Sequence, residues 1–121
     1  MIKVLYVDDE PLNVQLFRFN FCKKYIVFTA ESAFDALKIL QNEPDINVVI
    51  SDMRMPGMTG LEFIMKAKDD FPEIIYYILT GYAISSELGS AVKNGIIKRC
   101  FSKPLNIEEI EVSMNALLRI D

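Results

Sequence analysis

The chain has 121 residues, which is the size of one compact domain. Of these residues, 51% are hydrophobic and 25% are charged. This composition is typical of a folded globular protein and excludes a disordered one. Its 13 basic and 17 acidic residues leave a net charge of −4, which argues against direct binding to nucleic acid. The chain contains no histidine, which excludes Ser-His-Asp and Cys-His catalysis and disfavours the usual zinc sites.

Neither a membrane segment nor an export signal is predicted. The longest apolar run, Ile74–Leu79, is much shorter than the ~20 residues of a membrane-spanning helix. The first residues, Met1–Val4, lead almost directly into an acidic pair and do not form a signal peptide. Cys22 and Cys100 form no C-x-x-C motif, so we expect a reduced, cytoplasmic protein.

Short runs rich in β-branched and aromatic residues recur along the chain and are predicted to be strands. They are Ile2–Val7, Tyr25–Phe28, Val48–Ile50, Ile74–Leu79 and Arg99–Phe101. These runs show little alternation with polar residues, which is typical of strands that are covered on both faces.

The segment between the first two runs has a mixed pattern. Leu12–Leu16 and Phe17–Phe21 each alternate with period two, which favours a strand. Pro11 favours the first turn of a helix, and no turn signal divides the segment into a hairpin. We therefore predict a helix here.

The other four connections carry clearer helix signals. Capping residues precede three of them: Ser32 with Asp35, Thr59 with Glu62, and Asn106. Apolar residues then follow at helical spacing in all four. These residues are Ala33, Ala36, Leu37 and Leu40; Leu61, Ile64 and Met65; Ile84, Leu88, Ala91 and Val92; and Ile107, Ile110, Met114, Leu117 and Leu118.

Strands that alternate with helices imply an α/β fold in which helices cover both faces of a parallel sheet, here as one domain over residues 1–121. The carboxyl ends of such strands meet at one edge, where ligands bind. Polar groups follow four of the five predicted strands. They are Asp8-Asp9-Glu10, Ser51-Asp52, Thr80-Gly81 and Ser102-Lys103-Pro104.

Three carboxylates, a hydroxyl and an ammonium are therefore expected to converge at this edge. Carboxylates at that density repel one another unless a hard cation lies among them, and Mg²⁺ suits such oxygen ligands. A lysine and a threonine can hold the oxygens of a phosphoryl group while a carboxylate attacks it to form an acyl phosphate. Each motif alone is more often a cap, a turn or a solvated lysine, so the prediction rests on their joint occurrence.

The four motifs together resemble the receiver domain of two-component response regulators. The likeness covers essentially the entire chain, and its most specific part is the D-x-x-M-P-x-x-x-G stretch at Asp52–Gly60. The resemblance implies a doubly wound, flavodoxin-like fold with five helices and a five-stranded parallel sheet in the order 2-1-3-4-5. It also implies a phosphorylation-dependent signalling switch that is not an enzyme acting on other molecules.

The resemblance implies roles for individual residues around the phosphoryl group. Asp52 matches the phospho-accepting aspartate, Thr80 the switch hydroxyl, and Lys103 the ammonium that pairs with the phosphoryl group. Pro104 matches a proline that usually follows a cis peptide bond.

The resemblance also implies a Mg²⁺ site. Asp8 and Asp9 match the acidic pair that binds the ion, Asp9 directly and Asp8 through water. Asp52 and the main-chain carbonyl of Arg54 match the remaining protein ligands.

One position departs from the family pattern. Receivers usually carry Tyr or Phe three residues before the lysine, where this chain has Cys100. The adjacent Phe101 is expected to point to the opposite face of the sheet. Two alternatives stay open: either another side chain, with Tyr82 the nearest candidate, fills the space beside Cys100, or the two switch states differ less than usual.

The sequence disfavours three other functions. An unphosphorylated pseudo-receiver is disfavoured because all the active-site groups are present. An aspartate-nucleophile phosphatase would need a second aspartate where Arg54 stands, and a flavodoxin-like cofactor site would place a phosphate against the acidic Asp8–Glu10.

The expected partners are a sensor histidine kinase or a phosphotransfer protein, and a downstream effector domain or protein. We expect no direct contact with nucleic acid or membrane. The segments Ile84–Val92, Arg99–Phe101 and Ile107–Leu118 are expected to form the output face, through which a homodimer would also assemble.

Overall fold

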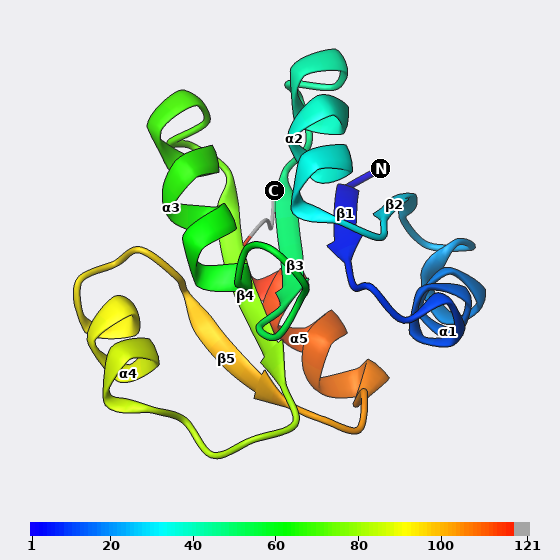
Figure 1. Cartoon of the computed structure of the whole chain (residues 1–121). Coiled ribbons are helices and arrows are strands. Elements are labelled where there is room, and N and C mark those ends of the chain that lie inside the picture. The colour runs from blue at the N-terminus through cyan, green and yellow to red at the C-terminus, as the bar shows by residue number, and fades with distance from the viewer. Residues whose placement is uncertain (118–121) are drawn as a thin grey trace.

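The computed structural model describes residues 1–117, in which five strands alternate with five helices (Figure 1). All the strand pairs are parallel, and the order in the sheet is β2-β1-β3-β4-β5. The predicted α/β class and strand order are confirmed. The elements are β1 (Lys3–Val7), α1 (Pro11–Phe21), β2 (Ile26–Ala30), α2 (Ala33–Asn42), β3 (Val48–Asp52), α3 (Gly60–Asp70), β4 (Ile75–Thr80), α4 (Ser86–Lys93), β5 (Arg99–Ser102) and α5 (Ile107–Leu117).

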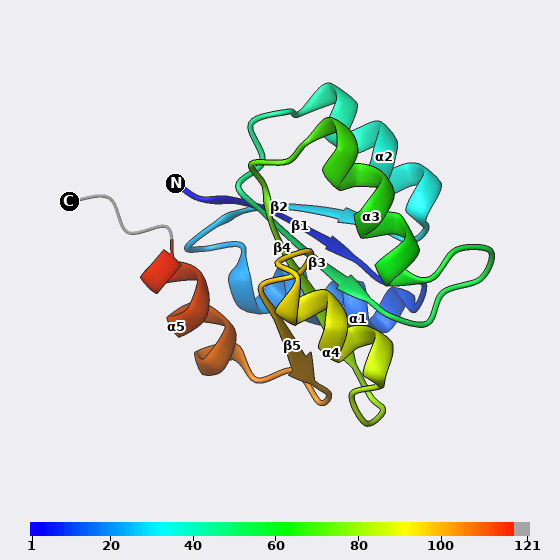
Figure 2. The same ribbon diagram turned by 90° about the vertical axis from the view of Figure 1, so that its left-hand side faces the viewer.

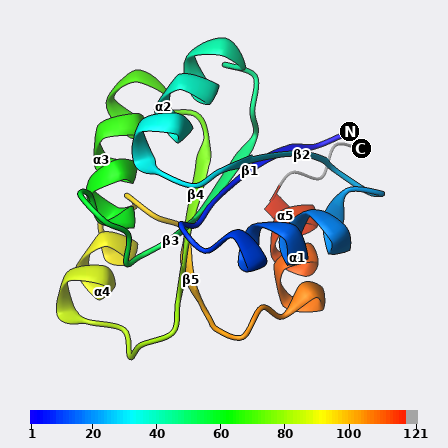
Figure 3. The ribbon, with the colours of Figure 1, turned by 45° about the vertical axis from the view of Figure 1, so that its right-hand side comes forward.

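Helices cover both faces of the sheet. Figure 3 shows α2, α3 and α4 on one face and α1 and α5 on the other, and Figure 2 shows α2 and α3 side by side. Alternate strand residues enter two different buried clusters, so that Leu5 and Ile78 face α2–α4 while Tyr6 and Tyr77 face α1 and α5. The apolar runs are continuous because both faces of each strand are buried. None of the helices within residues 1–117 is long and apolar enough to cross a membrane.

The ambiguous segment after β1 is a helix, as predicted. Pro11 occupies its first turn, and Val14, Phe17 and Phe21 are buried against the sheet. The exposed side also carries large apolar residues, among them Leu12 and Phe19. Because apolar residues lie on both sides of α1, the helical period is obscured in the sequence.

The predicted capping residues make the expected hydrogen bonds. The Ser32 side chain accepts from the main-chain N–H of Asp35 at 3.1 Å. Thr59 and Glu62 form a reciprocal capping box with distances of 3.1 and 2.9 Å. The Asn106 side chain accepts from a main-chain N–H in the first turn of α5 at 3.0 Å.

The prediction for the fourth helix was wrong at its start. The apolar spacing places Ile84 in the helix, but α4 begins at Ser86 because the Ser85 side chain caps it by accepting from the N–H of Leu88 at 3.2 Å. Ile84 lies in the preceding loop and is exposed, and Val92 is also largely exposed. In α3, the predicted apolar residue Met65 is likewise exposed. The predicted residue Leu118 lies outside the described residues.

Four strands extend further toward their carboxyl ends than predicted, and the first of them, β2, continues to Ala30. β3 includes Ser51 and Asp52, β4 includes Thr80, and β5 includes Ser102. A polar side chain does not interrupt the main-chain hydrogen bonds of a strand, and Thr80 still pairs with Ser102 in the ladder. The extra residues therefore hold the polar groups of the sheet edge on rigid strands rather than on loops.

Candidate functional site

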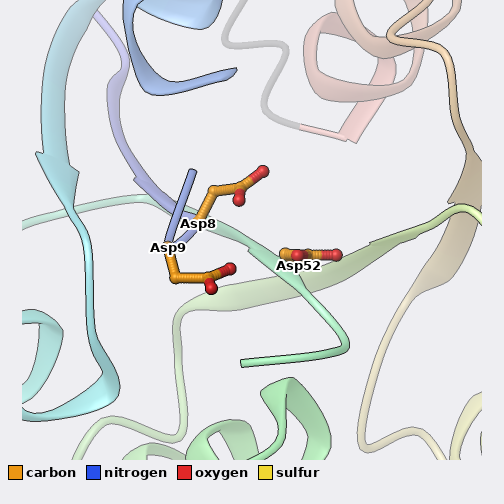
Figure 4. Close-up of side chains that lie close together, drawn as sticks. All are labelled: Asp8, Asp9 and Asp52. Atoms are coloured by element: carbon orange, nitrogen blue, oxygen red, sulfur yellow. The ribbon is translucent and has the colours of Figure 1, made fainter. Parts of the chain in front are cut away.

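Three carboxylates meet at the carboxyl ends of β1 and β3 (Figure 4). One oxygen from each of Asp8, Asp9 and Asp52 lies within 4.8 Å of the others. The two strands are neighbours in the sheet, and Val7 pairs with Ser51. Asp8 and Asp52, the next residue on each chain segment, are therefore side by side. Asp8 is fully buried and Asp52 is only 6% exposed, whereas Asp9 is half-buried.

Lys103 lies against two of these carboxylates. Its Nζ is 3.2 Å from Oδ1 of Asp52 and 3.7 Å from Oδ2 of Asp8. The residue follows β5, and its main-chain N–H donates to the carbonyl of Thr80 at 2.8 Å. The Lys103–Pro104 peptide is cis, as expected.

The carboxyl group of Asp52 is held in an environment that disfavours its charge. Burial raises the pKa of Asp52 above the ordinary value of 3.8, and the neighbouring Asp8 raises it further, although Lys103 opposes both effects. Three carboxylates face one ammonium, so negative charge is in excess. Oxygen ligands with surplus negative charge fit a hard divalent cation such as Mg²⁺.

This excess of charge predicts a pH-dependent stability difference. Asp52→Asn is expected to raise the free energy of unfolding at neutral pH in metal-free buffer, because the amide removes a charge that the folded state disfavours. The gain should disappear as the pH falls through the raised pKa of Asp52, since the wild-type carboxyl then binds a proton and becomes neutral as well.

Urea unfolding with a chelator present, at neutral and at acidic pH, measures this difference. The matched control is Asp45→Asn, because Asp45 is exposed and its ion pair with Lys3 lowers its pKa instead. That control should show no gain at neutral pH. A wild type more stable than the Asp52 variant at neutral pH would contradict the electrostatic account.

Thr80 lies at the same edge, at the end of β4. It is 3% exposed and follows Leu79, which pairs with Asp52 in the ladder. Its Oγ1 accepts a hydrogen bond from the main-chain N–H of Tyr82 at 3.2 Å. The orientation of the Thr80 hydroxyl is thereby linked to the backbone of the β4–α4 loop.

The loops after β3 and β4 are bridged by a contact that the sequence did not reveal. The guanidinium of Arg54 lies 4.0 Å from the centre of the Tyr82 ring. Both residues line a cavity of about 550 Å³, together with Met55, Thr80 and Leu88. The contact therefore joins two loops that line the same cavity as Thr80.

Two further features of the site were missed in the sequence. A Cβ atom at Gly60 would overlap the main-chain carbonyl of Asp52, so the first turn of α3 can approach the strand only with glycine there. Tyr6 and Asn13 both donate hydrogen bonds to Asp8. The last glycine of the D-x-x-M-P-x-x-x-G motif was a signal for the close approach at Gly60. A single tyrosine in an apolar strand was a weak signal for the hydrogen bond to Asp8.

The departure at Cys100 has the predicted geometry. Cys100 is half-buried and packs toward α2–α4, while Phe101 is fully buried on the opposite face, with its ring 5.0 Å from that of Tyr77. Tyr82 is 61% exposed, with the guanidinium of Arg54 over its ring.

These features define a class of protein. It is a doubly wound α/β domain that carries an acidic cluster and a lysine at the carboxyl edge of its sheet. The sequence model of the response regulator receiver domain matches residues 4–115. The chain belongs to the response regulator receiver domain family.

Several relatives agree with this assignment. The chain is 32% identical over 118 residues to sporulation initiation phosphotransferase F of Bacillus subtilis, covering 96% of this chain and 93% of that protein. It is 34% identical over 101 residues to the hydrogenase transcriptional regulatory protein HoxA of Cupriavidus necator, covering 84% of this chain but 21% of that protein. Two further transcriptional regulators also match, and this chain spans 33% of the length of one and 22% of the length of the other.

Solved structures show the same fold. A response regulator receiver domain protein from Clostridium thermocellum superposes with a TM-score of 0.88 at 30% identity, covering 96% of this chain and 93% of that one. The chemotaxis protein CheY4 of Vibrio cholerae superposes with a TM-score of 0.87 at 30% identity, covering 98% and 99%.

Membership of the family carries a general function. Receiver domains of two-component response regulators act as switches in phosphorylation-dependent signalling, and they generally bind Mg²⁺ at an acidic pocket. Response regulators interact with histidine kinases and with effector domains.

Proposed function

We propose that this chain, as one receiver domain over residues 1–121, accepts a phosphoryl group onto Asp52 from the phosphohistidine of a histidine kinase or a phosphotransfer protein. The observation that carries the proposal is the position of Asp52, which has Lys103 Nζ at 3.2 Å and the carboxylates of Asp8 and Asp9 beside it. A nearly buried carboxylate next to one ammonium and two further acids suits a phosphoryl acceptor better than a structural ion pair.

The transfer is a displacement at phosphorus. An oxygen of Asp52 forms the new O–P bond while the N–P bond to the donor imidazole breaks, and the electron pair of that bond returns to the imidazole nitrogen. Lys103 then pairs with one phosphoryl oxygen. The Thr80 hydroxyl turns to donate to another, giving up its bond from the N–H of Tyr82.

The chain offers a set of oxygen ligands for Mg²⁺. We propose that Asp9, Asp52 and the main-chain carbonyl of Arg54 bind the ion directly and that Asp8 binds it through water. When bound, Mg²⁺ neutralises the charge that develops on the phosphoryl oxygens during transfer. Asp8 and Asp9 hold negative charge next to Asp52, so without a cation they oppose the approach of a phosphoryl group.

The proposal is tested by incubating the full chain with acetyl phosphate and Mg²⁺ and measuring its intact mass. We expect a gain of about 80 Da, the mass of one phosphoryl group, and no gain when a chelator replaces the ion. An unphosphorylated pseudo-receiver would show no gain under either condition, and that result would contradict the proposal.

The lifetime of the phosphorylated form is expected to depend on the bridge between Arg54 and Tyr82. Hydrolysis needs a water molecule in line with the leaving oxygen, and the two large side chains line the cavity that also contains Thr80 and Met53, the residue after Asp52. The double variant Arg54→Ala/Tyr82→Ala is therefore expected to lose its phosphoryl group several-fold faster than the wild type.

Decay of the phosphorylated mass after removal of the donor measures this rate. Ile84→Ala is the matched control, because Ile84 is exposed in the same loop and does not line the cavity. An unchanged or slower decay in the double variant would remove the steric argument.

We propose that the output, including any homodimer, uses the face formed by α4, β5 and α5. Thr80 and Lys103 lead directly into these elements, and the main-chain bond between the two residues couples their positions. The ion pair of Arg99 with Glu109, at 3.2 Å, connects β5 to α5.

A further inference from the structure

The carboxylate of Asp8 is fully buried and already accepts three hydrogen bonds from this chain. The Tyr6 hydroxyl donates to Oδ2 at 2.7 Å, and the side-chain amide of Asn13 donates to the same oxygen at 3.1 Å. The main-chain N–H of Glu10 donates to Oδ1 at 3.0 Å.

These bonds leave Asp8 little freedom as a ligand. A carboxylate offers about four acceptor positions, two on each oxygen. Tyr6 and Asn13 occupy both positions on Oδ2, and Glu10 occupies one on Oδ1. The Nζ of Lys103 is 3.7 Å from Oδ2, too far for a hydrogen bond, so one position on Oδ1 remains.

Tyr6 is itself held in place, and its hydroxyl donates to Asp8. It is fully buried on the same side of β1 as Asp8, and its ring stacks on Phe17 of α1 with centroids 4.3 Å apart and planes 2° from parallel.

We propose that Tyr6, supported by Asn13, is a positioning residue that leaves Asp8 a single available oxygen, Oδ1, which faces a water molecule on the ion from one fixed direction. The inference rests on the proposed function, in which Asp8 contributes to the Mg²⁺ site. Mg²⁺ requires near-ideal octahedral geometry, whereas Ca²⁺ accepts six to eight oxygens and bidentate carboxylates. A fixed, one-oxygen Asp8 therefore favours Mg²⁺ over Ca²⁺.

Tyr6→Phe separates this role from packing, because it removes the hydroxyl and keeps the ring on Phe17. Loss of an outer-shell hydrogen bond at a metal site commonly weakens binding by 10–100-fold, so we expect the Mg²⁺ affinity of this variant to fall by about tenfold. The Ca²⁺ affinity should fall less, because the freed carboxylate can turn and offer both oxygens. The ratio of Mg²⁺ to Ca²⁺ affinity is therefore expected to decrease.

The experiment is a titration of the full chain with Mg²⁺ and, separately, with Ca²⁺, followed by amide NMR shifts, with thermal unfolding measured in parallel. Tyr77→Phe is the matched control, because Tyr77 is also fully buried but its hydroxyl bonds to Ser113 at 3.0 Å, away from the acids. The control should keep the wild-type affinities. Asn13→Ala is a second test that leaves the buried ring untouched, and it should lower the affinity ratio in the same direction.

Two results would overturn the role of Tyr6 while leaving the proposed function intact. One is a Tyr6→Phe variant with wild-type Mg²⁺ affinity and affinity ratio. The other is an equal loss of both ions that Tyr77→Phe shares, which would indicate a structural effect only. If Tyr6→Phe does not fold, a wild-type ratio in Asn13→Ala overturns the role. A wild type that does not bind Mg²⁺ would refute the proposed function and the inference with it.

Discussion

Asp52→Asn is expected to reduce phosphoryl transfer from acetyl phosphate by at least about 10³-fold, which removes any detectable mass gain. The amide has the same shape as the carboxylate but lacks its negative charge, so it cannot act as the nucleophile and loses the ion pair with Lys103 at 3.2 Å. Because the variant is expected to be more stable than the wild type at neutral pH, its inactivity would not reflect unfolding.

Asp45→Asn is the matched control for this loss. Asp45 also pairs with a lysine, Lys3 at 2.6 Å, but it precedes β3 and lies at the opposite edge of the sheet. Its asparagine variant should be labelled as fully as the wild type. Full labelling of the Asp52 variant would show that the acceptor is another residue.

Gly60→Ala is expected to have the largest effect on stability. The added methyl group would overlap the main-chain carbonyl of Asp52 and lie 3.0 Å from Cδ1 of Ile78. Because the obstacle is backbone rather than a flexible side chain, α3 or the end of β3 must shift. Overpacking of a buried position typically lowers the free energy of unfolding by up to about 3 kcal/mol. The shift also displaces Asp52, so the rate of phosphorylation should fall with the stability.

Chemical denaturation of Gly60→Ala and of Gly89→Ala measures this effect. Gly89 lies on the exposed side of α4, where an added Cβ meets no atom within 4 Å. Its alanine variant should be more stable than the wild type by about 0.5–1 kcal/mol, because glycine is unfavourable in a helix. A Gly60 variant as stable as the wild type would show that the first turn of α3 does not need this close approach.

The fold could be predicted from the sequence because local signals agreed with one another. The strand runs lacked polar alternation, and Ser32, Thr59 and Asn106 capped helices at the predicted places. The start of α4 could not be predicted in the same way. Ile84 continues the apolar spacing of Leu88 and Ala91, and only the hydrogen bond that Ser85 makes in the folded chain sets the start of α4 after it.

The candidate site was predictable where it depends on topology and hidden where it depends on packing. Parallel strands must bring Asp8, Asp52 and Lys103 to one edge, whatever the details of the loops. The bond from Tyr6 to Asp8 depends instead on strand alternation together with the depth at which Asp8 is buried. In the sequence, Tyr6 cannot be distinguished from the other tyrosines of the core.

The Arg54–Tyr82 contact was hidden for a different reason. The two residues lie on separate loops, and no periodic pattern relates positions in loops after different strands. Their bulk was visible in the sequence, but the stacking at 4.0 Å follows from the path of the β4–α4 loop after Thr80.

The central claim is that Asp52 itself carries the phosphoryl group, and reductive mapping tests it most directly. Borohydride converts an aspartyl phosphate to homoserine and leaves free aspartates unchanged. After treatment of the chain with acetyl phosphate and Mg²⁺, peptide sequencing by mass spectrometry should find homoserine at position 52 only, and at no position when a chelator is present. Homoserine at position 8 or 9 in place of 52, or at no position in a chain that has gained the phosphoryl mass, would contradict the claim.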